Sequence, residues 1–305
     1  MRWCLFFLIM LLIVRCDVPK AAPEKNPTLV VATDRLSEGD SLLLAEFGQK
    51  HQLEIVVKEM TADSLMQLYL QDPYGLGIDV VLLHHAYDMR RVQNKKMLEP
   101  LKQGKFPEEA LLTESKLFIT CGIDPFICVT KENVRINIYD DLNNHPFFLN
   151  LSHKSKTQFF APYEERLHRA KTFEKLEQLH TNVVPMKRWM ADSSHAFLTT
   201  YSDYRMKTPE DSLWNKFTEV QFPNSATSGV FHDVLSAGII QQSSHFATAT
   251  KLLEWLTSPE INKRLTANRG YDSIYSNGEY RRFTTPSEAL MQYHTMIERM
   301  LKEIE

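Results

Sequence analysis

The chain of 305 residues lacks the short motifs that identify most well-understood enzyme sites. It contains no GxxxxGK(S/T) phosphate loop, no GxSxG nucleophile turn, no HExxH zinc helix and no GxGxxG dinucleotide loop. Carboxylates are numerous, but nothing in their spacing marks two of them as an acid/base pair. We therefore expect a protein that is not an enzyme, with an unrecognised exported enzyme as the alternative.

Concentrated positive charge is also missing. The sequence has 35 Lys and Arg against 38 Asp and Glu, which gives a formal net charge of −3, and the basic residues are scattered. Binding to nucleic acid needs a clustered basic face. We therefore expect no nucleic-acid partner.

Cysteine is scarce, at four residues, and neither a CxxC pair nor a zinc-type spacing is present. Cys121 and Cys128 bracket the segment GIDPFI. If the chain is exported, these thiols can be joined in a disulfide across a turn at Gly122 and Asp124-Pro125. The interpretation we favour is two small buried side chains on successive strand segments.

The longest hydrophobic run, Trp3 to Val14, is too short for a transmembrane helix, which needs roughly 20 residues. Its length is typical of a secretory signal peptide. Cys16 follows, an order that resembles a bacterial lipobox, although Arg15 stands where that motif has a small residue. We predict a signal peptide or lipobox-like segment at 1–16 with lipidation at Cys16, and a flexible tether at 17–27. The protein would then be exported to the periplasm or cell surface and anchored to the membrane by its lipid; an uncleaved anchor and ordinary secretion are alternatives.

Downstream of the tether, hydrophobic strands alternate with amphipathic helices. The pattern predicts strands at 28–33, 53–60 and 78–84, and helices at 40–52, 61–72 and 86–98, the first with Asp40 as its N-cap. This βαβαβα order predicts a parallel sheet with helical crossovers, which binds ligands at the carboxyl ends of its strands. Those ends are Thr33-Asp34-Arg35 and Leu83-His84-His85.

The rest of the chain predicts a second α/β unit. Residues 117–136 and 195–201 are strand-like, and 157–192 have a helical pattern. Residues 229–240 predict a pair of strands that returns to the first unit, and two further helices follow. The final stretch from 286 predicts a helix with a buried Leu and Met stripe.

Two parts of the sequence resemble one family. The first part consists of VVATDRLSEGDSLLLAEFGQKHQLEIVVKEM and GIDVVLLHHAYDMRRVQNKKMLEPL, and the second contains SPEIN at 258–262 and ANRGY at 267–271. Both parts are similar to bacterial extracellular solute-binding proteins of ABC importers, closest to the ferric-iron-binding branch. The resemblance covers most of 28–280. It implies a two-lobed α/β fold, periplasmic-binding-protein-like of type II, with a ligand cleft between lobes joined by crossing strands. We assign lobe 1 to 28–120 and 225–265, and lobe 2 to 121–224 and 266–305.

The resemblance also implies a function. A protein of this family captures a small ligand in the cleft, here Fe³⁺ as the transported ligand, and delivers it to a permease and its ATPase. We expect a monomer. The alternative is a lipid-anchored binding protein for an anion or small organic solute that acts as a sensor or adaptor.

The stretch TTYSDYRM ends a predicted strand. The ferric-binding branch has two consecutive tyrosines followed by an arginine here, and alignment on Arg205 places Tyr201 on the first tyrosine and Ser202 on the second. Phenolate oxygens are hard donors that suit ferric iron. The resemblance therefore assigns Tyr201 as a metal ligand and leaves the motif half present. Tyr204 can take the second place if the turn is tight, Asp203 is a further hard oxygen donor, and Arg205 completes the expected ligand site. The alternative is a pair of rim tyrosines whose rings cover the hinge.

The first lobe offers Asp34, Arg35 and His84 as ligand-binding candidates. The Arg35 guanidinium is suited to grip a carboxylate, phosphate or carbonate; its alternative is an ion pair with an acidic neighbour, Asp34, Glu38 or Asp40. Adjacent residues of a strand face opposite ways, so at most one of His84 and His85 is expected to point inward. The alternative is a histidine that caps the following helix.

Overall fold

The computed structural model describes residues 27–102, 104–110, 116–130, 134–183, 196–206, 219–224, 229–276 and 287–304. The predicted signal segment, the lipidation site at Cys16 and all but the last residue of the tether lie outside these ranges and stay predictions. Within these ranges, no helix is both long and apolar enough to cross a membrane.

The described strands form one eight-stranded sheet of order β2-β1-β3-β8-β4-β6-β5, with β7 paired to β4. The strands are β1 (Thr28–Thr33), β2 (Glu54–Glu59), β3 (Val80–Leu83), β4 (Phe118–Thr130), β5 (Phe147–Leu149), β6 (Ala196–Thr200), β7 (Glu219–Gln221) and β8 (His232–Ile239). The helices are α2 (Glu38–His51), α3 (Ala62–Gln71), α4 (Ala86–Asn94), α5 (His153–Thr181), α7 (Tyr201–Arg205), α8 (Phe246–Leu256), α9 (Pro259–Arg269) and α10 (Ser287–Ile304), with short 3₁₀ turns at Glu108–Ala110 and Tyr139–Asn143.

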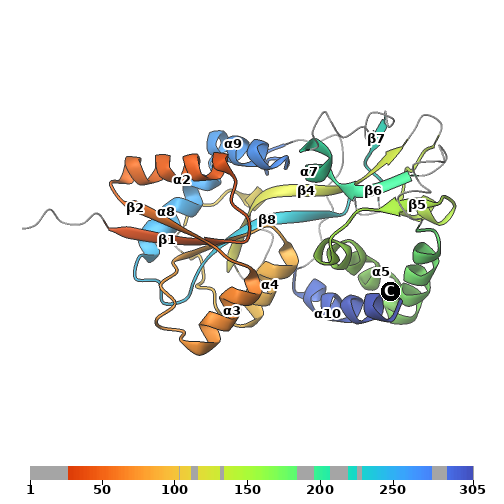
Figure 1. The fold of residues 1–305 in the computed structure, drawn as a ribbon, viewed down its shortest axis with the longest axis horizontal. Helices are drawn as coiled ribbons and strands as arrows, with labels where there is room; N and C mark the ends of the chain where they lie inside the picture. The colour runs from red at the N-terminus through yellow and green to blue at the C-terminus, as the bar shows by residue number, and fades with distance from the viewer. Residues whose placement is uncertain are drawn as a thin grey trace, which may run out of the picture.

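Strands β4 and β8 join two lobes (Figure 1). Lobe 1 contains β1 to β3 with α2, α3, α4, α8 and α9, and lobe 2 contains β5 to β7 with α5, α7 and α10. The two strands pair antiparallel from Phe118 to Pro125, after which β4 leaves β8 and pairs with β6 from Phe126 to Val129. A single strand thus belongs to the sheets of both lobes.

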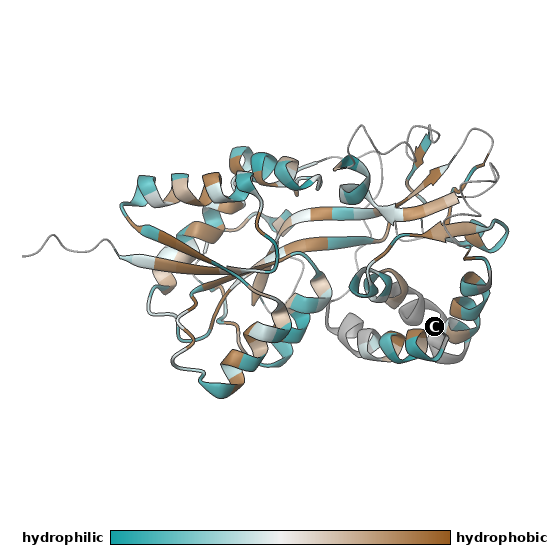
Figure 2. Cartoon of the chain, viewed as in Figure 1, coloured by the Kyte–Doolittle hydropathy of each residue, from teal (hydrophilic) through white to brown (hydrophobic). Residues whose placement is uncertain are grey.

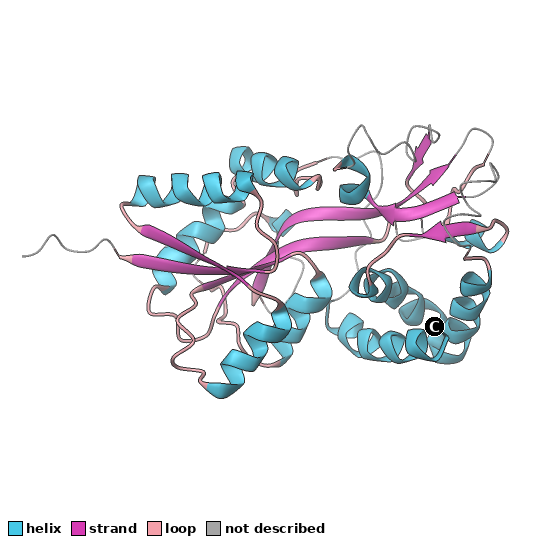
Figure 3. Ribbon diagram, in the orientation of Figure 1, coloured by secondary structure: helices cyan, strands magenta, loops and turns pink. Residues whose placement is uncertain are grey.

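The sheet of lobe 1 is covered on both faces. Val80 and Leu82 pack into a cluster with α2, α8 and α9, whereas Val81 and Leu83 pack into a cluster with α3 and α4 (Figure 3). The two sets alternate because successive strand side chains point to opposite faces. A sheet buried on both faces is built from continuous hydrophobic runs, and Figure 2 shows its strands largely in brown.

The two cysteines of β4 do not form a disulfide. Both are buried and free, and Cys121 lies in the core of lobe 1 while Cys128 lies in the core of lobe 2. Six residues of extended strand lie between them, which separates their Cα atoms by roughly 20 Å, whereas a disulfide allows at most about 7 Å. The segment GIDPFI is therefore strand rather than turn, and the interpretation as small buried side chains is confirmed.

Two local predictions are wrong. Helix α2 is capped by Ser37, whose hydroxyl accepts from the Asp40 nitrogen, while the Asp40 carboxylate accepts from the Ser37 nitrogen in a capping box. Asp40 is therefore the third residue of the helix and not its cap. The expected pair of strands at 229–240 is the single strand β8.

The lobe boundaries assigned from the sequence stay a proposal. The division at residue 265 falls inside α9, and residues on both sides of it, Leu265 and Tyr271, belong to the hydrophobic cluster of lobe 1. Helix α10 packs on α5 in lobe 2, with Ile297 and Met300 in that core.

Asn262 joins α9 to β4 and to the segment after α9. Its buried amide nitrogen donates to the Cys121 carbonyl at 2.7 Å, and its oxygen accepts from the Ser273 hydroxyl at 2.6 Å and the Ile274 nitrogen at 3.2 Å. We predict that Asn262→Ala lowers the free energy of unfolding by about 3 kcal/mol, because it leaves buried backbone groups without partners. Urea unfolding measures this loss. Lys263→Ala, at the next, exposed position of α9, is the control, and a loss below about 1 kcal/mol for Asn262→Ala would contradict the prediction.

Candidate functional site

A cleft of about 350 Å³ opens between the lobes. Lobe 1 lines it with Asp34, Arg35, Thr61, His84, His85 and Tyr271. Lobe 2 lines it with Ser152, Lys154, Ser155, Thr200, Ser202 and Asp203, and Asp124 of β4 lies at the junction. A hollow of about 720 Å³ between α2 and β2 is larger, but the described residues around it come from lobe 1 alone and are uncharged.

Local structure places these side chains. Asp34 and Arg35 follow β1, His84 and His85 follow β3, and Asp203 follows β6, so all five stand where strands end. Helices begin at the same place: Thr61 and Ser152 are the N-caps of α3 and α5, and their hydroxyls accept from the Ser64 and Ser155 nitrogens. The positive ends of two helices therefore face the cleft.

Asp34 and His84 are tied to each other. The His84 Nδ1 lies 2.6 Å from the Asp34 carboxylate, and the His84 backbone nitrogen donates to that carboxylate at 3.2 Å. Arg269, which is held by Asp40 at 2.7 Å, contacts the other ring nitrogen of His84. Burial and the Arg269 charge lower the pKa of His84 to about 4 against the opposing effect of Asp34. Burial raises the pKa of Asp34, but the hydrogen bonds and charge of His84 outweigh it and leave that pKa lowered.

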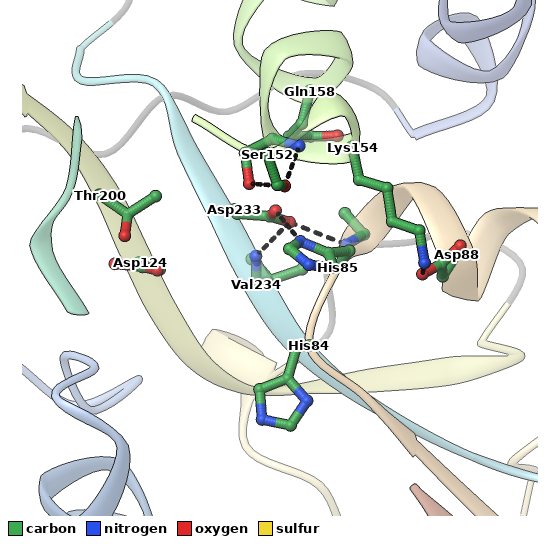
Figure 4. A network of polar contacts seen from close by, with 12 residues as sticks. His84, His85, Asp88, Asp124, Ser152, Lys154, Gln158, Thr200, Asp233 and Val234 are labelled. Carbon is green, nitrogen blue, oxygen red and sulfur yellow. Dashed lines mark hydrogen bonds and ion pairs between the residues drawn. The ribbon is translucent and has the colours of Figure 1, made fainter. Parts of the chain in front are cut away.

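His85 forms a second pair, with Asp233 of β8. Its Nδ1 lies 2.7 Å from one Asp233 oxygen, and the other oxygen accepts from the Ala86 and Val234 nitrogens at 2.8 and 2.9 Å (Figure 4). Burial lowers the pKa of His85, but the Asp233 charge and hydrogen bond raise it to about 9. The ring is therefore an imidazolium at neutral pH.

One prediction about the histidines is wrong, and a second holds only in part. Both His84 and His85 line the cleft, because β3 ends at Leu83 and strand alternation does not extend to them. His85 occupies the N-cap position of α4 but makes no capping bond with its side chain. The Asp233 carboxylate accepts from the Ala86 nitrogen of α4 instead.

Arg35 does not pair with an acidic neighbour. Asp34 binds His84 and Asp40 binds Arg269, and in the part of the chain that the structure describes the exposed guanidinium has neither a hydrogen bond nor an ion pair. Asp203 lies exposed across the cleft. Burial raises its pKa, and Thr200, Arg35 and His85 oppose that rise.

The tyrosines of TTYSDYRM lie beside the cleft. Among the described residues, those that line the cleft include Asp203 but not Tyr201, Tyr204 or Arg205. The Tyr201 and Tyr204 rings stack at 6.5 Å and pack on the Ile127, Val129 and Phe197 cluster. The Tyr201 hydroxyl accepts from Arg205 at 2.9 Å, and Arg205 also pairs with Asp272 at 3.0 Å.

Several lining residues were not singled out from the sequence. Asp124 is buried and accepts from the Ser202 nitrogen and hydroxyl at 2.8 and 2.6 Å; burial raises its pKa to about 7 against those bonds. Lys154 of α5 pairs with Asp88 of α4 across the lobes at 2.5 Å (Figure 4). Tyr271 could have been found from ANRGY, the motif quoted for the resemblance.

The donor set offers little to a bare metal ion. In the described ranges, no group of three or more His, Cys, Asp or Glu is arranged to hold one. Tyr271 is the phenol that lines the cleft in those ranges, and burial together with Asp124 and Asp233 keeps its pKa well above the ordinary value. A hard cation that used this phenol as a ligand would have to displace its proton.

The His85–Asp233 pair predicts a pH dependence of stability. Because the folded pKa of His85, about 9, exceeds the ordinary 6.5, the pair's contribution is fully present below pH 6.5 and is lost as pH rises to about 9. It amounts to at most about 3 kcal/mol. Urea unfolding of wild type and His85→Gln should show a difference that shrinks over this range. A difference for His85→Gln that is constant with pH would refute the assignment.

No protein-family model and no curated protein matches the sequence. The structure is similar to FutA (IdiA) of Trichodesmium in complex with iron and citrate, with a TM-score of 0.79 and 16% identity over 91% of this chain and 99% of that one. Apo FutA2 from Synechocystis PCC6803 gives a TM-score of 0.79 at 15% identity, over 92% of this chain and 99% of that one. The ferric binding protein from Campylobacter jejuni gives a TM-score of 0.75 at 16% identity, over 90% of this chain and 99% of that one. At such identities the likeness concerns the fold, and the predicted two-lobed α/β fold of type II periplasmic binding proteins is confirmed.

Proposed function

We propose that the chain is the extracellular solute-binding component of an ABC-type importer. It captures a small ligand in the cleft and delivers it to a permease and its ATPase. The observation that carries this proposal is that the cleft is lined from both lobes, whose sheets share β4. A ligand that contacts both lobes stabilises their closed arrangement, which a permease can recognise.

The absence of catalysis belongs to the same proposal. Asp34 and Asp124, two carboxyl groups that line the cleft, accept hydrogen bonds from protein donors, as expected of a site that holds a ligand unchanged. We further propose export, with Cys16 lipidated and the tether holding the body near the membrane. A sensor or adaptor that uses the same cleft is the alternative.

Ferric iron is one candidate ligand, because the Trichodesmium FutA structure is a complex with iron and citrate and the Campylobacter structure is that of a ferric binding protein. Tyr201, between the lining residues Thr200 and Ser202, is the phenol that the resemblance assigns to it. Its hydroxyl is already bonded by Arg205, so an iron ion bound there has to displace that guanidinium. Iron binding by Tyr201 would therefore cost the hydrogen bond from Arg205, and it can be tested directly.

The test is a ferric citrate titration of the purified chain, followed by visible absorption and thermal melting. If iron is the ligand, a tyrosinate-to-iron band appears, and an excess of about 100 times the Kd adds about 2.7 kcal/mol to stability. Tyr201→Phe should abolish the band, whereas Tyr74→Phe, at a tyrosine 83% exposed on lobe 1, should leave it intact. Binding without a tyrosinate band would reject Tyr201 and Tyr204 as metal ligands and leave the solute-binding proposal standing.

A further inference from the structure

The cleft contains no described aliphatic side chain. Each of its described lining residues carries a charge, an imidazole or a hydroxyl group, and Tyr271 is the single aromatic carbocycle among them. A hydrophobic ligand would gain little from such walls, because apolar contact is what drives the binding of apolar groups. The cleft therefore suits a small, strongly polar solute.

Most charges at the cleft already have partners in the protein. Asp34 is bonded to His84, Asp124 to Ser202, and Lys154 to Asp88. These groups shape the floor and wall, and a ligand that bound to them would have to break existing bonds. They do not define the charge of the ligand.

Arg35 and Asp203 are the exception. Both are exposed in the cleft, Arg35 on lobe 1 and Asp203 on lobe 2, and neither forms an ion pair within 4.0 Å in the described part of the chain. Burial raises the pKa of Asp203, and Thr200, Arg35 and His85 oppose that rise, so the Arg35 charge acts on this carboxyl group across the cleft. Opposite charges thus face each other from the two lobes without touching.

His85 adds to the positive side. Its Nδ1 is engaged by Asp233, and its other ring nitrogen has no partner among the described residues. The side chain is 26% exposed, lines the cleft and is protonated at neutral pH. Arg35 and His85 line the same cleft, and N–H groups of charged side chains such as these are suited to bind a carboxylate.

This arrangement disfavours ligands of a single charge sign. A pure anion meets the Asp203 carboxylate, and a bare cation meets Arg35 and His85, and either repulsion weakens binding. A molecule with both charges satisfies all three groups and contacts both lobes.

We propose, on the basis of the solute-binding function above, that the ligand is a small zwitterion with a carboxylate bound by Arg35 and His85 and an ammonium group bound by Asp203. The L-α-amino acids are the simplest members of this class. Because its two charged ends are held by different lobes, such a ligand closes the cleft directly.

The experiment is thermal melting of the purified chain with each proteinogenic L-amino acid, and in parallel with ferric citrate and inorganic phosphate. Calorimetry then gives the Kd of each hit and of two analogues, the acid without the amine and the amine without the carboxylate. We expect at least one amino acid to raise the Tm, and each analogue to bind at least about tenfold more weakly. Arg35→Gln and Asp203→Asn should each weaken binding by a similar factor. Arg264→Gln, at an exposed arginine paired with Glu46 outside the cleft, should leave the Kd unchanged.

The outcomes separate this inference from the proposed function. If ferric citrate or phosphate binds and no amino acid does, the zwitterion is wrong and the solute-binding function stands. An amino acid whose affinity survives loss of its amine or its carboxylate also overturns the zwitterion. If no probe of any class raises the Tm, both proposals fail.

Discussion

The antiparallel pairing of β4 with β8 is the constraint on which the rest of the molecule depends. Both strands run from the sheet of lobe 1 towards lobe 2. Along its length β4 changes its pairing partner from β8 to β6. Backbone pairing fixes how side chains alternate along a strand. It therefore sets which groups of β4 and β8, among them Asp124 and Asp233, stand at the junction between the lobes.

The charged groups at this junction follow a simple rule. A carboxylate removed from water needs donors, and here another element contributes to them: Ser202 of α7 for Asp124, and His85 before α4 for Asp233. Each pair therefore joins segments distant in the sequence while it satisfies a buried charge. Arg35 and Asp203 are treated differently because they remain exposed to water, and charges that keep their hydration remain available to a ligand.

The alternation of strands and helices in lobe 1 could be predicted because it depends on local periodicity, as with Val80 to Leu83. Residues 117–136 could be recognised as strand-like, but not as one continuous strand that crosses between the lobes. Phe118–Thr130 is buried throughout, so it has no alternation, and its Asp-Pro pair looks like a turn until the partner strand is known. Strand ends located Asp34, Arg35, His84 and Asp203 at the cleft, but the orientation of Tyr201 depends on the cluster around Phe197, which no local pattern reveals.

The placement of the two buried thiols has a consequence for dynamics. Cys121 and Cys128 sit on one strand but in the hydrophobic cores of different lobes, and burial raises the pKa of each thiol. Neither reacts until its own core opens, so the rates of their modification report the opening free energies of the two lobes separately. The two thiols therefore report on the coupling between the lobes. Different modification rates would mean that the lobes open independently, whereas equal rates would mean that the shared strand makes them open as one cooperative unit.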